Sequence, residues 1–436
     1  MNTRPEQAPS EQNGISGVFQ NRNFRLLWSS QIFGQSAQNA ILFVQTVMVE
    51  GLTRSSGLVG IMVVMYYLPA ILFGLLSGIV IDRYRKKSIL LFCSISRVFV
   101  VASFIFFHRY TAGAGLLTAV YALSFVLSTI GQLSDPAEAA TVPLLVPANL
   151  LLTANSVFHL LFNVSQVIGI LFLAPVSVKL AGVDGGFAVI SLAYLITSVL
   201  IWFVSVDESQ PERQSTENIL PQLWEELKAG WGFIAGSRSV FIAICQHALV
   251  TMLTMILATL APGFATRVLH MQPADAVYIF FSAGVGMLGV TLWTSQAGHR
   301  FRRESLVGVG FLITMVSFLG FAFITWSGEN ASGMAAAPPA LVIMQVVFMA
   351  LLLGIGMTLA VVPAQTIVQE RTPHAIRGRV IAAQFIFINL VGLVPMLVIS
   401  GLADLVGIPK VMLGLAVLTL ASSLLSFRLR RTLQGA

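Results

Sequence analysis

Charged residues are few in this 436-residue chain: only 10% of its residues are Asp, Glu, Lys or Arg, whereas 56% are hydrophobic. A soluble globular domain carries about 25% charged residues, because its surface must be hydrated. The composition therefore excludes a water-soluble globule and predicts a protein that crosses a membrane several times. The net charge of +7 does not indicate nucleic-acid binding, because the cations lie in short clusters between apolar runs, as in loops that orient membrane proteins.

Other absences narrow the class further. The only two cysteines, Cys93 and Cys245, lie far apart in apolar segments, so we predict no disulfide. The chain lacks the motifs of metalloproteases, serine hydrolases, P-loop proteins and dinucleotide-binding enzymes, and it lacks repeated filter-like loops. We therefore expect neither an enzyme nor a channel, and no cofactor or metal. Residues 1–21 lack the apolar core of a signal peptide, so the first apolar segment is expected to remain in the protein.

Long apolar runs are what the sequence has in abundance. A helix needs about 20 residues to cross about 30 Å of hydrocarbon, and twelve segments reach that length. We predict an all-α membrane protein with twelve transmembrane helices in two pseudo-symmetric six-helix bundles. The predicted spans are 24–49, 57–81, 88–107, 114–138, 153–178, 185–206, 240–263, 276–296, 306–326, 340–367, 380–400 and 408–427.

The basic residues predict the orientation. An even number of spans puts both termini on one side, and assigning that side to the cytoplasm leaves most of the 25 Lys and Arg residues in inner loops and tails. The exceptions outside are Arg54, Arg109, Lys179, Arg267 and Lys410. We therefore predict a multi-pass protein of the cytoplasmic (inner) membrane with both termini cytoplasmic.

The span positions also predict the domain organisation. A six-helix bundle at 24–206 follows a cytoplasmic tail at 1–23, and a second bundle at 240–427 precedes a cytoplasmic tail at 428–436. The connection at 207–239 is cytoplasmic and contains apolar residues at helical spacing, which predicts an amphipathic helix at the membrane surface. These residues are Leu220, Leu223, Trp224, Leu227 and Trp231.

The two halves of the chain share short patterns. Pro136-Ala137-Glu138 is followed by Pro147 after the fourth span, and Pro363-Ala364-Gln365 is followed by Pro373 after the tenth. Matching patterns at matching places indicate an internal duplication. Transporters are commonly built from such repeats.

The run from Gly78 to Lys87 places one carboxylate and four cations between two apolar segments. It resembles the signature loop between helices 2 and 3 of the major facilitator superfamily, with Arg85 where the family usually has Gly. The resemblance implies two bundles that rock in alternating access. In that family the acid of this loop, here Asp82, approaches the start of helix 11 when the cytoplasmic side is closed. A plain positive-inside anchor is the alternative. The implied gating residues are Gly78, Asp82, Arg83, Arg85, Lys86, Lys87, Arg377 and Arg379.

Within the superfamily, the chain is most similar to the branch that contains macrolide-efflux proteins and the enterobactin exporter. The similarity rests on Pro136-Ala137, Val146-Pro147, Ala154-Asn155, Val368-Gln369-Glu370 and Arg377-Gly378-Arg379-Val380. Many relatives carry a Gly-Asp pair in helix 1, where this chain has Gly34-Gln35-Ser36. A proton-coupling acid is therefore missing from that helix position.

Polar residues within spans are candidates for a substrate cavity, because polar groups are costly in lipid unless they face a cavity or a partner. Three spans carry such residues along one face at helical spacing. The alternative is that their amides and hydroxyls join helices by hydrogen bonds, and the histidines are as readily packing residues as proton carriers. The candidates are Gln31, Gln35, Gln38 and Gln45; Asn155, His159, Asn163 and Gln166; and His247, Thr251 and Thr254.

One cation lies deep within a span. Arg97 is about 14 Å along its helix from the cytoplasmic start, and Asp135 should reach a comparable depth on the next helix. We predict that the two neutralise each other, with Glu138 as the alternative acid. The pair is either static or broken and remade during transport, and Asp135 and Glu138 are the carboxylates available for proton coupling.

These features predict a secondary active transporter that exports amphipathic drug-like or siderophore-like small molecules. We expect an antiporter driven by an ion gradient, with the proton as the first candidate for the coupling ion. Its expected partners are this substrate, the coupling ion and the lipid bilayer, with no nucleic acid, and the expected state is a monomer. Transport of a lysophospholipid or another lipid is the alternative. A non-transporting membrane sensor or scaffold is the third reading.

Overall fold

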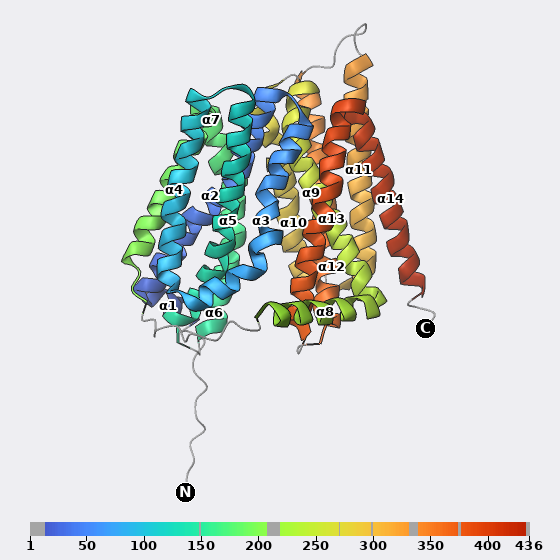
Figure 1. Ribbon diagram of the computed structural model, residues 1–436. Helices are drawn as coiled ribbons and strands as arrows, with labels where there is room; N and C mark the ends of the chain where they lie inside the picture. The colour runs from blue at the N-terminus through green and yellow to red at the C-terminus, as the bar shows by residue number, and fades with distance from the viewer. Residues whose placement is uncertain are drawn as a thin grey trace. The chain divides into compact units, whose positions relative to one another are not determined.

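The computed structural model describes residues 14–147, 150–206, 219–269, 271–297, 300–330, 339–373 and 376–432, and every regular element in these ranges is a helix (Figure 1). The elements are α1 (Gly14–Gln20), α2 (Arg22–Thr53), α3 (Ser56–Arg83), α4 (Lys86–Tyr110), α5 (Gly113–Leu145), α6 (Leu151–Val167), η3 (Ile168–Leu173), α7 (Ala174–Phe203), α8 (Ile219–Gly236), α9 (Arg238–Arg267), η4 (Pro273–Ala276), α10 (Val277–Ala297), α11 (Arg303–Asn330), α12 (Pro339–Arg371), α13 (Arg377–Val406) and α14 (Ile408–Thr432).

The predicted all-α membrane class is confirmed, because ten helices of the described residues are long and apolar enough to cross a membrane. Neither α2 nor the stretch formed by α6 and η3 is among the ten, although both coincide with predicted spans. Helix α2 is less apolar than the other long helices because it carries Arg22, Arg25, Glu50 and several amides. The count of twelve spans therefore stays a prediction.

Helix α7 combines parts of two predicted spans. It runs from Ala174 to Phe203, but Gly182 has a φ of 70° and interrupts the helical backbone. Glycine adopts this left-handed conformation without the steric penalty that a Cβ brings. The interruption falls between the predicted spans 153–178 and 185–206, so the chain turns where the sequence predicted a loop.

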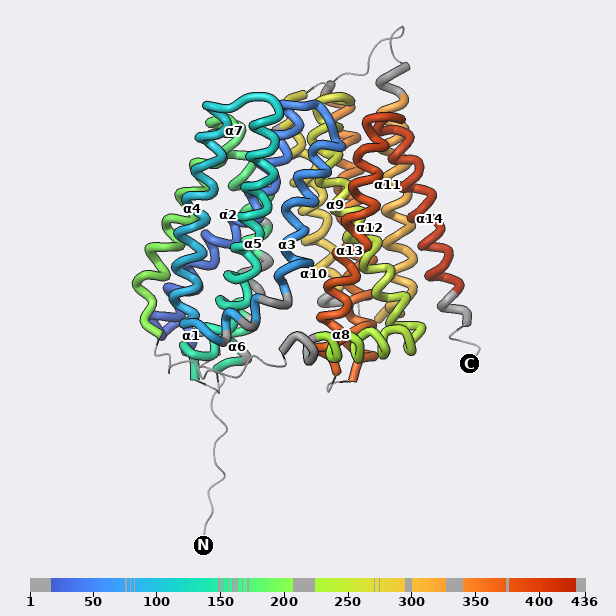
Figure 2. Tube along the Cα trace, viewed as in Figure 1, coloured from blue at the N-terminus to red at the C-terminus, as the bar shows by residue number. Residues whose placement is uncertain are grey.

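The helices pack as two compact units. Unit 1 comprises Met1–Leu42 and Leu72–Gln214, and unit 2 comprises Phe43–Ile71 and Ser215–Ala436. In unit 1, α4 packs against α5 and α7, and in unit 2, α11 packs against α12 and α14 (Figure 2). The boundaries cut through α2 and α3, whereas the sequence predicted contiguous bundles at 24–206 and 240–427. Residues 43–71 group with the later helices because their side chains and backbone bond to α9 and α13.

The connection between the predicted bundles contains helix α8, as the apolar spacing indicated. Helix α8 packs against α9 and α13 and lies crosswise to them (Figure 1). Trp231 contacts Phe387 of α13 with ring centroids 5.4 Å apart, and Trp224 is exposed. Residues 207–218 lie outside the described part of the chain.

Glycines bring the helices of unit 2 close together. A Cβ added to Gly354 of α12 would collide with the backbone carbonyl of Ala283 of α10, and one added to Gly356 would lie 2.7 Å from the carbonyl oxygen of Gly310 of α11. Small residues let helix backbones approach in membranes, where apolar burial gives no driving force between helices. The position of α12 against α10 and α11 therefore depends on these glycines.

We predict that Gly354→Ala lowers the stability of the protein by about 1–3 kcal/mol, because the added methyl group overpacks a backbone contact. The matched control is Gly289→Ala in α10, where an added Cβ meets no atom within 4 Å. Thermal unfolding in detergent, followed by size-exclusion chromatography, compares the two. Equal midpoints for both variants would contradict the close packing of α10 and α12.

Candidate functional site

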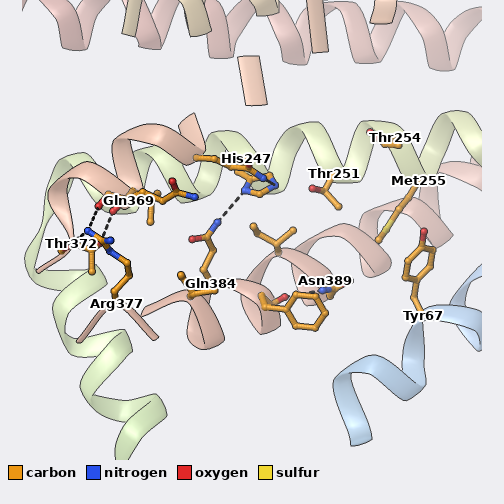
Figure 3. A pocket seen from close by; sticks show the side chains of 15 residues that line it. Tyr67, His247, Thr251, Thr254, Met255, Gln369, Thr372, Arg377, Gln384 and Asn389 are labelled. Atoms are coloured by element: carbon orange, nitrogen blue, oxygen red, sulfur yellow. Dashed lines mark hydrogen bonds between the residues drawn. The ribbon is translucent and has the colours of Figure 1, made fainter. Parts of the chain in front are cut away.

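Unit 2 contains a cavity of about 490 Å³. It is lined by residues of α3, α9, α12 and α13 and by Thr372, which directly follows α12 (Figure 3). The polar lining residues are Tyr67, His247, Thr251, Thr254, Gln365, Gln369, Thr372, Arg377, Gln384 and Asn389. A cavity of this size accommodates a small organic molecule.

His247 lies between two glutamine side chains. The Nε2 atom of Gln365 is 3.2 Å from Nε2 of His247. Nε2 of Gln384 is 3.0 Å from Nδ1 of the same ring (Figure 3). An amide presents either NH₂ or C=O after a half-turn, so the two glutamines can serve a ring nitrogen as donor or as acceptor. The arrangement supports both neutral tautomers of the imidazole.

The single fixed charge among the described lining residues, Arg377, lies at one end of the cavity. Its Nη2 donates to the carbonyl oxygens of Gln369 at 3.0 Å and of Thr372 at 3.4 Å (Figure 3). These carbonyls lie at the C-terminal end of α12, where the last carbonyls of a helix lack intrahelical partners. Arg377 therefore joins the start of α13 to the end of α12.

The remaining lining of the cavity is neutral. No carboxylate occurs among the residues described there, and Met255, Ile381, Phe385 and Ile388 supply apolar surface. A pocket of hydrogen-bonding groups set in apolar and aromatic surface suits a molecule that is itself partly polar and partly apolar. It offers little to a ligand that carries several fixed charges.

Unit 1 holds a separate charged cluster. Nη2 of Arg97 lies 3.9 Å from Oδ1 of Asp135 and donates to Oε1 of Gln38 at 2.9 Å. The amide of Gln38 donates in turn to Oδ2 of Asp135 at 3.1 Å. Gln38 therefore bridges the arginine and the carboxylate, and it connects α2, α4 and α5.

The surroundings of Arg97 favour a buried cation. Arg97 is 5% exposed. Its Cζ lies 5.3 Å from the ring centroid of Tyr194, within the range of a cation–π interaction. Gly131 leaves space for the guanidinium, since an added Cβ would lie 3.1 Å from Nη2. The side chain of Asp135 is 38% exposed, although its Oδ1 is buried. Glu138, one turn further along α5, is buried. The cluster thus pairs one arginine with a partly exposed acid and lies near a buried one.

The structure distributes the candidate glutamines of α2 unevenly. Gln31, Gln35 and Gln45 are buried, and Gln38 belongs to the Arg97 cluster. Both side-chain polar atoms of Gln31 and of Gln45 lack a hydrogen-bond partner among the described residues. None of the four lines the cavity of unit 2, so their role in substrate binding stays a prediction.

The other two groups of candidates differ from each other. His247, Thr251 and Thr254 line the cavity of unit 2 together. On α6 of unit 1, Asn155 and Gln166 are exposed. The side chains of His159 and Asn163 lie outside the described residues.

The candidate gating residues occupy helix ends. Gly78, Arg83 and Arg85 are exposed, and Lys86 and Lys87 are half-buried at the start of α4. The side chain of Asp82 lies outside the described part of the chain. Nη2 of Arg379 is 3.8 Å from Oε1 of Glu226, which links the start of α13 to α8.

Sequence reasoning missed four lining amides, Gln365, Gln369, Gln384 and Asn389. Gln365 stands in the repeated Pro-Ala pattern, and Gln384 and Asn389 are amides within a predicted span, which was the available signal. Gln384 and Asn389 lie five residues apart, so they do not form a stripe along one helix face. His247 becomes part of a polar group only when α9, α12 and α13 pack together.

The sequence is similar to those of known membrane transporters. Residues 27–395 match the sequence profile of the Major Facilitator Superfamily. An uncharacterised MFS-type transporter of Bacillus subtilis, YfiS, is 24% identical over 343 residues, which cover 79% of this chain and 77% of the relative. A second one, YkuC, is 23% identical over 188 residues and 42% of each chain.

Solved structures show the same fold at low identity. The POT-family transporter PepTSo aligns with a TM-score of 0.70 and 13% identity, over 95% of this chain and 98% of its own. The nucleoside transporter NupG aligns at 0.71 and 11%, over 93% and 98%. A bacterial homologue of the iron transporter ferroportin, in an inward-facing state, aligns at 0.70 and 14%, over 93% and 98%. With the profile covering most of the chain, the protein belongs to the Major Facilitator Superfamily.

Proposed function

We propose that this protein is a secondary active transporter that exports amphipathic small molecules across the cytoplasmic membrane by alternating access. The cavity of unit 2, whose described lining is neutral apart from Arg377, carries the proposal. Its amides, hydroxyls and single histidine can bond to a polar group, while Met255 and Phe385 contact apolar parts of the same molecule. The substrate class follows from this mixture.

The direction of transport rests on the resemblance to the macrolide-efflux and enterobactin-exporter branch. The excess of basic residues on one side of the predicted spans supports cytoplasmic termini. With that orientation, α8 and the starts of α9 and α13 lie at the cytoplasmic side, and the chain takes up substrate there. The gating assignment of Asp82, Arg377 and Arg379 belongs to the same proposal.

The proposed coupling site is the cluster of Arg97, Asp135 and Glu138. One arginine cannot neutralise two carboxylates fully, and an uncompensated charge in a membrane protein is costly. A proton on one acid removes the excess negative charge. Asp135 is the better candidate because its side chain is partly exposed whereas Glu138 is buried, and because it contacts Arg97 and Gln38.

The transport proposal is tested by expression in an efflux-deficient host that is screened against drugs, siderophores and lipids. The expected result is lower accumulation of one or more amphipathic compounds, and a His247→Ala variant of equal yield should lose the effect. Export confined to lysophospholipids would replace the substrate class. No change in accumulation of any compound, with purified protein also inactive in proteoliposomes, would contradict transport.

We predict that Gln384→Ala raises KM by about 2- to 10-fold with little change in folded yield, because one hydrogen bond contributes about 0.5–1.5 kcal/mol. The control is Gln246→Ala, another buried amide, which bonds to Ser426 away from the cavity. Kinetics in proteoliposomes separate the two variants. If KM is unchanged in Gln384→Ala, or rises equally in the control, the cavity is not the substrate site.

We predict that Asp135→Asn makes the transport rate nearly constant between about pH 6 and about pH 8, because an amide cannot exchange a proton. The variant keeps an oxygen that can accept the bond from Gln38, and Glu138 remains near Arg97 to balance its charge. Only variants with a folded yield equal to that of the parent are compared. Glu138→Gln serves as the comparison. Full pH dependence in Asp135→Asn together with its loss in Glu138→Gln would move the coupling site to Glu138.

A further inference from the structure

Three charged side chains meet at helix ends within unit 2. Glu50 lies in the last turn of α2, Arg267 is the last residue of α9, and Asp404 lies in the last turn of α13. Helix α9 begins beside α8 and extends for 30 residues, about 45 Å, before Arg267. The cluster therefore lies at the end of unit 2 that is remote from α8 and from Arg377.

Asp404 binds the N-terminus of α3. Its Oδ1 accepts the backbone N–H of Ser56 at 2.9 Å, and its Oδ2 accepts the N–H of Gly57 at 2.9 Å and the hydroxyl of Ser55 at 2.6 Å. The first N–H groups of a helix have no intrahelical partner, and the helix dipole attracts an anion there. The same carboxylate is unfavourable in the last turn of its own helix α13. Contact with the N-terminus of α3 offsets this unfavourable position.

Arg267 supports this contact. Its Nη1 donates to Oδ1 of Asp404 at 2.8 Å, and its Nη2 donates to the hydroxyl of Ser56. Nε of Arg267 lies 3.7 Å from Oε1 of Glu50 and makes no hydrogen bond to a described residue. The arginine is therefore bonded to Asp404 and α3, and it only approaches Glu50.

Glu50 is the incompletely satisfied member. It is 0% exposed, its Oε1 accepts the hydroxyl of Thr266 at 3.1 Å, and its Oε2 has no hydrogen-bond partner among the described residues. The charged groups that act on it are Arg267, Asp404 and Arg54, and Arg54 is exposed. A buried carboxylate that lacks bonds is costly when ionised. Protonation of Glu50, or a closer bond to Arg267, removes that cost.

We propose that Glu50, Arg267 and Asp404 form a proton-responsive latch that holds α3 against α13. A proton from water binds Glu50 while Arg267 is bonded to Asp404, which favours the closed latch. When Glu50 returns the proton to water, its negative charge attracts Arg267 away from Asp404. The hydrogen bonds between Asp404 and the N-terminus of α3 are then weakened, and α3 and α13 can separate. The latch rests on the proposed alternating access and orientation, which place it at the outer side.

The test measures access to the cavity from outside. Thr251→Cys is introduced in a Cys93→Ser, Cys245→Ser background, and intact cells are treated with a membrane-impermeant maleimide. Asp404→Asn should increase the labelling rate, by up to about tenfold, because it removes a contact made only in the closed state. Arg267→Lys should act in the same direction, since lysine cannot bridge Asp404 and Ser56 in the same way. Lys410→Gln, an exposed cation at the start of α14, is the control and should leave the rate unchanged.

Glu50→Gln distinguishes a latch from a merely structural cluster. Because glutamine mimics the protonated acid, this variant should label more slowly than the parent. Because maleimide reacts with the thiolate, each rate is divided by that of a free thiol such as glutathione at the same pH. The normalised rate of the parent should fall as the external pH falls, and Glu50→Gln should lose this dependence. Two results would show that Glu50 is not the protonation site. One is faster labelling of Glu50→Gln, as in Asp404→Asn, and the other is a normalised rate of Glu50→Gln that keeps the pH dependence of the parent. The latch itself is overturned if Asp404→Asn and Arg267→Lys both label like the parent.

A cysteine at Lys228 of α8 tests the proposed orientation separately. It should resist the impermeant reagent in intact cells and react in inverted vesicles. Labelling of this cysteine in intact cells would reverse the proposed orientation without overturning the latch. If the orientation is reversed, the same variants are compared in inverted vesicles. There the latch predicts the same order of labelling rates, with Asp404→Asn and Arg267→Lys faster than the parent and Glu50→Gln slower.

Discussion

The constraint on which this structure depends is that a charge in a low-dielectric interior must be neutralised close by. Arg97 and Arg267 are each met by a carboxylate supplied by another helix, Asp135 from α5 and Asp404 from α13. Removing one member of such a pair leaves an uncompensated charge, which costs far more than the pair itself contributes. Each arginine therefore restricts which helices can be neighbours in its unit.

Both clusters contain more acid than base. Glu138 is buried one turn from Asp135, and Glu50 is buried 3.7 Å from Arg267. An arginine that approaches two acids has more than one low-energy arrangement, and a proton can decide between them. Such a site is suited to a conformational equilibrium rather than to maximal stability. This is the physical basis for assigning coupling to one cluster and latching to the other in our proposals.

The cavity of unit 2, in contrast to the two charged clusters, is lined almost entirely by neutral groups. His247 is held by the amides of Gln365 and Gln384, and the one arginine at its edge bonds to carbonyls of α12. Neutral groups recognise a ligand without the large desolvation cost of fixed charges. In the proposed function, substrate recognition and the response to protons therefore use separate residues, and a change in one need not abolish the other.

Much of this architecture could be predicted from local patterns. Apolar runs predict helices because the backbone must satisfy its own hydrogen bonds in lipid, and α8 falls where the apolar residues of the linker recur at helical spacing. The proximity of Arg97 and Asp135 also followed from the sequence, since consecutive spans run side by side and the two residues lie at similar depth. The bridging role of Gln38 did not, because it depends on how α2 packs against both helices.

Tertiary structure alone decided the remaining contacts. Asp404 is 348 residues from Ser56 and 137 from Arg267, and no local spacing links such distant positions. In the sequence, Arg267 is merely one outer cation and Asp404 an acid beyond a predicted span. The division of α2 and α3 between the two units is equally invisible, because a continuous apolar helix carries no signal of which neighbours each half contacts. The sequence by itself determined which segments are helices in the membrane, whereas only packing determined which helix ends meet and which polar groups share a site.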